Sequence, residues 1–319
     1  MQNAKLSIII PVYNAAAYIE NCVSSILCQT YPSIEILLIN DGSTDISGDI
    51  CDKLASGNSS IKVIHKENRG SSSARNLGLD LMTGDYFTFC DIDDELCDQK
   101  IYEVAIKCFG EPEVDAVFWG ARFCENNHEE EFCFEEKEIK VDTHMKKMMQ
   151  NKTYPLSGYV WNKMWRRTAL KTLSGQMIKF DENIFAYEDM IWILYNMENV
   201  RKIRTLSRIG YSYKIREDSL SHDIEKRLNI TKNGVDAYLL LKEYYQKENQ
   251  KELVKETNKT IINMLLIKLI VALKAGDKYM LRGLKDMFLA YRKYMKYNPS
   301  VKMRIWMVII SLVYKLNKI

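Results

Sequence analysis

The stretch LSIIIPVYN, residues 6–14, begins as a short apolar run that is typical of a buried strand and ends on polar side chains. Four more strand-like runs follow it, at 34–39, 61–65, 86–90 and 116–123. Between them lie stretches with apolar residues at three- and four-residue spacing, which is typical of helices, at 15–29, 45–56, 72–82 and 99–109. This alternation predicts an α/β fold, Rossmann-like, with a mostly parallel sheet and helices on both of its faces.

The rest of the chain predicts a second, smaller unit. Residues 125–142 are acidic and predict a surface loop or hairpin, after which come a helical pattern at 188–197 and a strand-like run at 202–213. From Ile224 onward the pattern is helical throughout. We therefore expect a large domain over 1–220 and a C-terminal helical region over 221–319.

Composition indicates a folded, globular, cytoplasmic protein. Among 319 residues, 47% are hydrophobic and 27% are charged, which argues against a disordered or fibrous chain. The 8 cysteines show no CxxC spacing, so we expect free thiols in a reducing compartment. The first residues lead straight into a strand pattern without a signal peptide.

Positive charge is concentrated in the C-terminal region. From His222 to the end there are 20 Lys and Arg residues against 9 Asp and Glu residues. Such a region can face an anionic membrane surface, which predicts peripheral association with the inner face of the membrane. A solvated lysine-rich helix face is the alternative. The apolar stretch at 305–313 is too short to span a bilayer, for which about 20 residues are needed.

Function is expected at the carboxyl ends of the strands, where open α/β sheets bind their ligands. The polar residues at those ends include Tyr13, Asp41 and the run Asp91-Ile92-Asp93-Asp94. Clustered carboxylates are hard to desolvate together, and a divalent cation with phosphate oxygens is the simplest partner for such a DxD motif. The alternative for the DxD run is an acidic loop that caps the next helix. The alternative for Asn40-Asp41-Gly42-Ser43 is an ordinary turn without a role in binding.

Several motifs together, in this order, resemble family 2 glycosyltransferases, which adopt the GT-A fold. They are SIIIPVYN at 7–14, NDGSTD at 40–45, HKENRG at 65–70, SARNLG at 73–78, DIDD at 91–94, WNK at 161–163 and Glu188-Asp189. The resemblance extends to about residue 220. It implies an inverting enzyme that transfers a hexosyl or N-acetylhexosaminyl group from a nucleoside diphosphate sugar, most commonly a UDP-sugar, to an acceptor hydroxyl.

The resemblance also implies roles for individual residues. Pro11 and Tyr13 would line the nucleobase pocket, with Asp41 reading the base and Arg75 close to it. Asp91 would face the ribose, and Asp93 would bind Mn²⁺ or Mg²⁺ that bridges the two phosphates.

Residues further along the chain are expected on the diphosphate and acceptor sides. Asp189 would be the general base that deprotonates the acceptor, although an acidic pair at a helix N-terminus is the alternative for Glu188-Asp189. Arg216 would pair with phosphate oxygens, and His222 would complete the metal site, against the alternative of a surface histidine. Lys163 and Arg166 would contact the diphosphate or the acceptor, unless they are structural.

The expected partners are a nucleotide-sugar donor and a saccharide or lipid-linked saccharide acceptor, in polysaccharide biosynthesis at the bacterial cell surface. A nucleotide-sugar-binding or scaffold protein of the same fold without turnover is the alternative. A nicotinamide dehydrogenase is disfavoured because Tyr13-Asn14-Ala15 stands where a GxGxxG loop would follow the first strand. No nucleic-acid partner is expected, since only the basic C-terminal region would support one.

Overall fold

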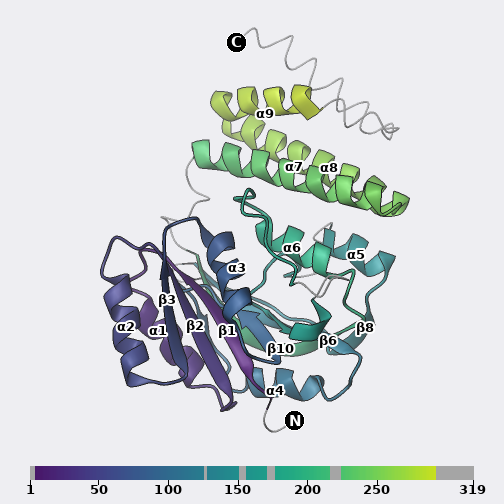
Figure 1. Cartoon of the computed structure of the whole chain (residues 1–319). Coiled ribbons are helices and arrows are strands. Elements are labelled where there is room, and N and C mark those ends of the chain that lie inside the picture. Colours follow the sequence, from purple (N-terminus) through teal and green to yellow (C-terminus); the bar gives the residue numbers. More distant parts are fainter. Residues whose placement is uncertain (1–3, 126–127, 151–155, 171–176, 216–223, 292–319) are drawn as a thin grey trace.

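The computed structural model describes residues 4–125, 128–150, 156–170, 177–215 and 224–291. A large sheet with flanking helices forms the lower part of the molecule in Figure 1, and three long helices lie together above it. The chain therefore has the predicted α/β architecture followed by C-terminal helices.

The sheet combines a parallel core with shorter antiparallel strands. Its strand order is β3-β2-β1-β4-β9-β6-β10-β5, with β7 paired to β6 and β8 paired to β10. Pairs β1–β2, β2–β3, β1–β4 and β6–β10 are parallel, which confirms the mostly parallel sheet. The bounds of the strands are β1 Leu6–Val12, β2 Ile34–Asp41, β3 Ile61–Lys66, β4 Tyr86–Phe89, β5 Glu95–Leu96, β6 Val114–Glu125, β7 His128–Phe132, β8 Lys137–Lys140, β9 Lys163–Arg166 and β10 Lys202–Ile215.

Helices pack against the parallel strands. Leu6, Ile8, Ile9 and Ile10 of β1 are all fully buried, although neighbouring residues of a strand point to opposite faces. Both faces of the sheet are therefore covered. The bounds of the helices in this part are α1 Ile19–Leu27, α2 Ser47–Gly57, α3 Ser71–Leu81, α4 Ile101–Cys108, α5 Thr143–Gln150 and α6 Glu188–Asn196, with a 3₁₀ turn at Arg167–Ala169.

Close packing fixes α3 against the sheet. Gly78 of α3 lies so near Ile9 of β1 that an added Cβ would come within 2.3 Å of the Ile9 side chain. Any larger residue at position 78 would push the helix away from the strand. The glycine of the SARNLG motif therefore sets the depth at which α3, and Arg75 on it, sits over the sheet.

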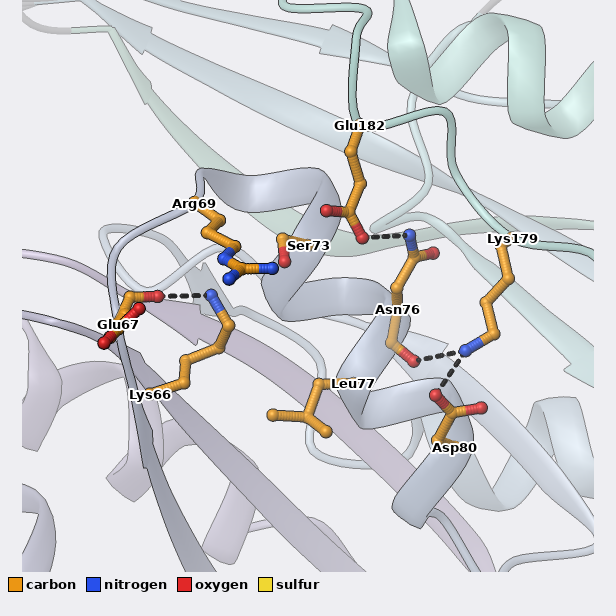
Figure 2. A pocket seen from close by; sticks show the side chains of 9 residues that line it. All are labelled: Lys66, Glu67, Arg69, Ser73, Asn76, Leu77, Asp80, Lys179 and Glu182. Atoms are coloured by element: carbon orange, nitrogen blue, oxygen red, sulfur yellow. Dashed lines mark hydrogen bonds and ion pairs between the residues drawn. The ribbon is translucent and has the colours of Figure 1, made fainter.

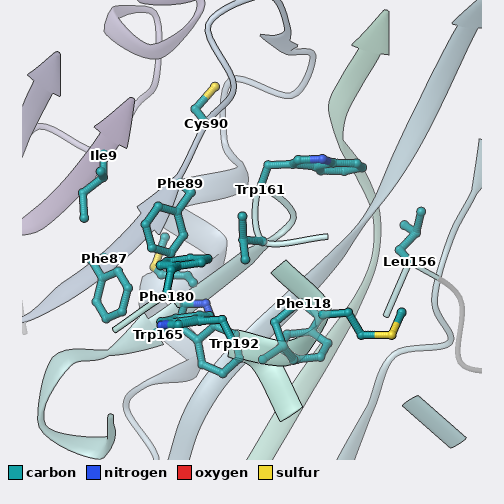
Figure 3. Close-up of a cluster of buried hydrophobic side chains, with 14 of the residues drawn as sticks. Ile9, Phe87, Phe89, Cys90, Phe118, Leu156, Trp161, Trp165, Phe180 and Trp192 are labelled. Carbon is teal, nitrogen blue, oxygen red and sulfur yellow. The ribbon is translucent and has the colours of Figure 1, made fainter. Parts of the chain in front are cut away.

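A buried aromatic cluster lies under the carboxyl ends of the central strands (Figure 3). Phe180 and Trp192 stack with ring centroids 4.8 Å apart, and Phe89 meets both rings edge to face. Asn76 of α3 holds Phe180 through two hydrogen bonds, because its side-chain amide donates to the Phe180 carbonyl and accepts from the Phe180 amide. The cluster thus connects β4, α3 and α6.

The acidic segment 125–142 is part of the sheet. Its strands β7 and β8 pair antiparallel with β6 and β10 respectively, so the two do not pair with each other. Arg122 forms ion pairs with Glu129 and Glu131 of β7, and Arg204 of β10 bonds Glu138 of β8. Where a surface loop or hairpin was expected, the segment contains two strands, β7 and β8, that extend the sheet.

In the C-terminal region the structure describes α7 Ile224–Lys247, α8 Lys251–Ala275 and α9 Lys278–Tyr291. These helices pack on one another, and α7 also contacts α6. Within the described ranges, no helix is both long and apolar enough to cross a membrane. The expected boundary near residue 220 falls outside the described residues.

Candidate active site

Two loops at the carboxyl ends of β1 and β2 are tied together. The Asn14 side-chain oxygen accepts from the Thr44 amide at 2.8 Å, and the Ala15 amide donates to the Ser47 hydroxyl at 2.8 Å. Asn14 adopts a positive φ of 47°, which turns the chain sharply after β1. This geometry leaves Tyr13 50% exposed and Pro11 half-buried at the same edge of the sheet.

Asp41, at the end of β2, anchors the loop that leads into α3. Its carboxylate is buried and accepts from the Arg69 amide at 3.1 Å and the Gly70 amide at 2.7 Å, and it also bonds the Lys66 ammonium. Gly70 has a φ of +87°, a conformation that glycine adopts without strain. In this arrangement protein donors already occupy the Asp41 oxygens, so Asp41 fixes the shape of the loop.

Arg75 is the centre of the site. Its buried guanidinium bonds the carboxylate of Asp91 at 3.0 Å, of Asp189 at 2.9 Å and of Glu188 at 3.3 Å. It also lies 5.5 Å from the centroid of the Phe180 ring. One arginine thus joins the DxD loop after β4 to the acidic pair that opens α6, segments about a hundred residues apart in the sequence.

Asp189 is partly open to solvent, with 17% of its side chain exposed. Burial, together with the charges of Glu188 and Asp91, raises the pKa of Asp189 to about 7, although Arg75 opposes that shift. The backbone of Val160 also opposes the rise in the pKa of Asp189. A carboxyl group whose pKa lies near neutrality can accept a proton from a reacting hydroxyl.

The carboxylates after β4 differ in their surroundings. Asp91 and Asp93 are half-buried, whereas Asp94 is buried and accepts from the Tyr211 hydroxyl at 3.0 Å and the Lys214 amide at 2.9 Å. The Tyr211 oxygen in turn accepts from the Asp91 amide at 3.0 Å. Burial and the charges of Asp91 and Asp93 raise the pKa of Asp94 to about 8. Asp94 and Tyr211 therefore hold the DxD loop against β10.

A divalent cation fits this donor set. The described ranges contain no group of three or more His, Cys, Asp or Glu side chains arranged to hold a metal ion. Mg²⁺, however, needs only one or two protein carboxylates when phosphate oxygens and water complete its shell. The half-buried Asp93 would supply one oxygen; burial, and after it the charges of Asp91 and Asp93, raise the pKa of the neighbouring Asp94.

Lys163 and Arg166 both have structural partners. Lys163 is fully buried, and its ammonium donates to the carbonyl oxygens of Leu156 and Tyr159 and to the Asn162 side chain. Arg166 donates to the Val114 carbonyl at 2.9 Å. Contact of Lys163 with a diphosphate would require its present bonds to break. The expected phosphate ligand Arg216 and metal ligand His222 lie outside the described residues.

A pocket of about 370 Å³ lies along α3 (Figure 2). Its walls carry three basic side chains, Lys66, Arg69 and Lys179, and Asn76 and Asp80 of α3. Lys66 and Arg69 belong to the loop that Asp41 anchors. Neither Arg75 nor the carboxylates that it bonds line this pocket.

The sequence analysis assigned no individual role to Asp94 or Tyr211 and did not single out Tyr159. Their positions in the sequence indicate a place near the site for Asp94 and Tyr211, because Asp94 ends the acidic run after β4 and Tyr211 lies in β10. Tyr159 precedes the WNK motif by one residue and is 37% exposed beside Asp189.

Comparisons with known proteins agree with this geometry. The model of the family "Glycosyl transferase family 2" matches residues 7–173. Glycosyltransferase GlyA of Streptococcus pneumoniae is 33% identical over 229 residues, which cover 68% of this chain but only 31% of the pneumococcal protein.

Two solved structures share the fold. The crystal structure of S. aureus TarS 1–349 in complex with UDP-GlcNAc has a TM-score of 0.57 at 20% identity, with 93% of this chain and 94% of that chain covered. The mannosyltransferase PcManGT from Pyrobaculum calidifontis, in complex with GDP-Man and Mn²⁺, has a TM-score of 0.57 at 16% identity, with 99% and 88% covered. The family model spans more than half of the chain and includes Arg75 and the DxD loop, so this protein belongs to glycosyl transferase family 2.

Proposed function

We propose that this protein transfers a sugar from a nucleoside diphosphate sugar to an acceptor hydroxyl with inversion at the anomeric carbon. The observation that carries the proposal is the single cluster of Arg75, Asp91 and Asp189. Through Arg75 it connects the DxD loop to the carboxyl group of Asp189, which is 17% exposed and has a pKa of about 7.

The chemistry is a single displacement. An acceptor oxygen attacks the anomeric carbon, the bond from that carbon to the diphosphate oxygen breaks, and the hydroxyl proton passes to Asp189. Attack from the face opposite the leaving group inverts the configuration, so an α-linked donor gives a β-linked product. Asp91 and Asp93 lie on the donor side of this reaction and Asp189 on the acceptor side.

Asp93, with phosphate oxygens and water, would hold Mn²⁺ or Mg²⁺. The bound ion supplies Lewis-acid stabilisation of the charge that develops on the leaving diphosphate. Tyr211 and Asp94 position the loop for this purpose, because they bond the backbone at Asp91 and Lys214. Arg75 holds Asp91 and Asp189 at a fixed separation before the donor arrives.

We infer a UDP-sugar as the donor, with a hexosyl or N-acetylhexosaminyl group. The UDP-GlcNAc complex of TarS supports this inference through the shared fold. The GDP-Man complex of PcManGT makes a GDP-sugar the alternative donor to be tested. For the acceptor we propose a saccharide or lipid-linked saccharide in cell-surface polysaccharide synthesis. The basic residues from Lys274 onward, 11 Lys and Arg against 2 Asp and Glu, support contact with an anionic membrane surface.

A donor panel tests the proposal. UDP-, GDP- and dTDP-sugars, each with Mg²⁺, Mn²⁺ or chelator, are compared for their effect on the melting temperature, because a ligand of the folded state raises it. We expect a metal-dependent rise with one UDP-sugar and a product of inverted configuration by NMR. Donor binding with no transfer or hydrolysis under any condition would instead indicate a nucleotide-sugar-binding protein without turnover.

A further inference from the structure

A row of aromatic side chains forms one wall of the site. Trp161 stacks with Tyr211 at a centroid distance of 4.2 Å and with Tyr159 at 4.8 Å. Tyr213 lies 5.8 Å from Trp161 and 6.2 Å from Tyr159. Because Tyr211 bonds Asp94 and the Asp91 amide, the row runs from the DxD loop toward Tyr159.

Tyr159 is held next to the candidate base. Burial and the charge of Asp189 raise the pKa of Tyr159, the backbone of its neighbour Val160 opposes the rise in that of Asp189, and the Tyr159 carbonyl accepts from the buried Lys163 ammonium. Gly158, on the other side, lies so near Met190 that an added Cβ would come within 2.8 Å of the Met190 side chain. The turn that carries Tyr159 therefore packs directly on the first turn of α6, where Asp189 stands.

The Tyr159 side chain is exposed to solvent, whereas its neighbours Trp161 and Tyr211 are buried. Tyr159 is 37% exposed, whereas Trp161 and Tyr211 are at most 1% exposed. Trp161 stacks on the Tyr159 ring at an interplanar angle of 26°, with the ring centroids of Phe123 at 6.0 Å and Tyr213 at 6.2 Å, and the exposed part of the ring is what these neighbours leave uncovered. An open aromatic face beside a proton-accepting carboxylate is suited to a ligand that brings both C–H groups and a hydroxyl.

We propose that Tyr159 is the platform for the acceptor and that the acceptor residue bound there is a pyranose sugar. This inference rests on the proposed function and identifies the substrate class of its acceptor side. The C–H groups of one pyranose face would pack on the electron-rich ring, and a hydroxyl at the edge of the sugar would meet Asp189. That hydroxyl oxygen forms the new glycosidic bond and its proton passes to Asp189.

The hydroxyl of Tyr159 adds a polar contact at the rim of this platform. Burial of the group, with the charge of Asp189, raises the pKa of Tyr159 above its ordinary value, so the phenol stays neutral at pH 7. A neutral phenol both donates and accepts hydrogen bonds. An open-chain polyol offers the same hydroxyls as a sugar but no flat face, so the platform distinguishes these two acceptor classes.

The test compares ring acceptors with an open-chain one. The probes are methyl β-D-glucopyranoside, methyl β-D-galactopyranoside and methyl N-acetyl-β-D-glucosaminide, with sorbitol as the polyol. Saturation-transfer NMR, with UDP and Mg²⁺ present and the aromatic protons of the protein saturated, measures the binding of each probe. Transfer to each probe is measured with the UDP-sugar that most stabilises the protein, and release of free sugar from that donor reports reaction with water.

Three variants separate the aromatic face from packing. Tyr159→Phe keeps the face, and we expect transfer to the glycosides within about threefold of the parent. Tyr159→Ala and Tyr159→Leu remove it, and we expect kcat/KM for the glycosides to fall about tenfold or more. Leucine keeps apolar bulk against Trp161 if alanine does not fold. Tyr279→Ala, which removes a tyrosine 53% exposed on α9, is the matched control and should change nothing.

The outcomes are distinguishable from failure of the proposed function. If the proposal is right, Tyr159→Ala and Tyr159→Leu lose glycoside binding and transfer, Tyr159→Phe keeps both, and UDP affinity and donor hydrolysis stay as in the parent in all three. Equal NMR signals for sorbitol and the glycosides in the parent would overturn it, as would unchanged glycoside binding in Tyr159→Leu. Failure of the proposed function would show instead as a parent that neither binds nor hydrolyses any nucleotide sugar, whatever Tyr159 does.

Discussion

Arg75→Met removes the charge that joins the two halves of the site. Methionine fills a similar volume and leaves the carboxylates of Asp91, Glu188 and Asp189 without their shared cation. The Arg75 side chain is only 6% exposed, so the loss is that of a buried ion pair and not of a surface one. Removing one partner of such a pair costs about 3–5 kcal/mol of unfolding free energy.

The loss should grow with pH. The pKa of Asp189 is about 7 with Arg75 present, and it rises further in Arg75→Met because the opposing charge is gone. A carboxyl group with a raised folded pKa contributes stability that is complete below its unfolded pKa and is lost as pH rises through the folded pKa. In the variant this loss continues above pH 7, at about 1.4 kcal/mol for each unit by which the pKa rises.

Urea unfolding at pH 6 and pH 8.5, followed by circular dichroism without metal or donor, measures the effect. We expect the difference between parent and Arg75→Met to be larger at pH 8.5. Arg69→Met, which replaces an exposed arginine six residues earlier, is the control and should change stability by less than about 0.5 kcal/mol. Equal stability of parent and Arg75→Met at both pH values would refute the reasoning.

Asp93→Ala should abolish transfer, and neither Mn²⁺ nor Mg²⁺ should restore it, whereas each ion restores a chelator-treated parent; full activity of the parent in excess chelator would contradict this. Asp94→Asn should flatten the fall in unfolding free energy between about pH 4 and pH 8, because Asp94, with a folded pKa of about 8, loses its contribution over that range. An unchanged pH slope in urea titrations would show that Asp94 is not the titrating group. Truncation after Pro299 should abolish salt-sensitive binding to anionic vesicles and leave donor binding intact; co-sedimentation of both forms to the same extent would exclude the membrane contact.

The strands of the parallel core could be predicted from the sequence. Apolar runs such as 6–11 and 34–39 are short and bounded by polar residues, so their strand character and their functional ends could be predicted together. The short strand β9 could not, because Lys163–Arg166 contains two charged residues. It inserts antiparallel between β4 and β6, a pairing that depends on tertiary context.

The positions of the charged side chains were less predictable. Arg75 was expected near a nucleobase, and the structure places its guanidinium on three carboxylates, two of them over a hundred residues away. Lys163 was expected at the diphosphate or the acceptor, but the turn at 156–162 surrounds its ammonium with oxygens. Which cation meets which anion depends on burial, and no local pattern encodes that choice.

Asp94 shows the same limit. In the sequence it is one of three similar carboxylates, and only its burial against Tyr211 distinguishes it from Asp93. The aromatic pattern of β10, with Tyr211 and Tyr213 two residues apart, does indicate that both side chains point to one face of the sheet. It does not indicate that this face meets the DxD loop.

Asp189→Asn tests the central claim most directly. The amide keeps the shape of the side chain and cannot accept the proton, so donor binding should stay close to that of the parent while transfer slows by roughly 10²–10⁴-fold. Calorimetry with UDP-sugar and Mg²⁺ gives the affinity, and single-turnover transfer gives the rate. A loss of donor affinity as large as the loss of rate would place Asp189 in the donor site and contradict the account.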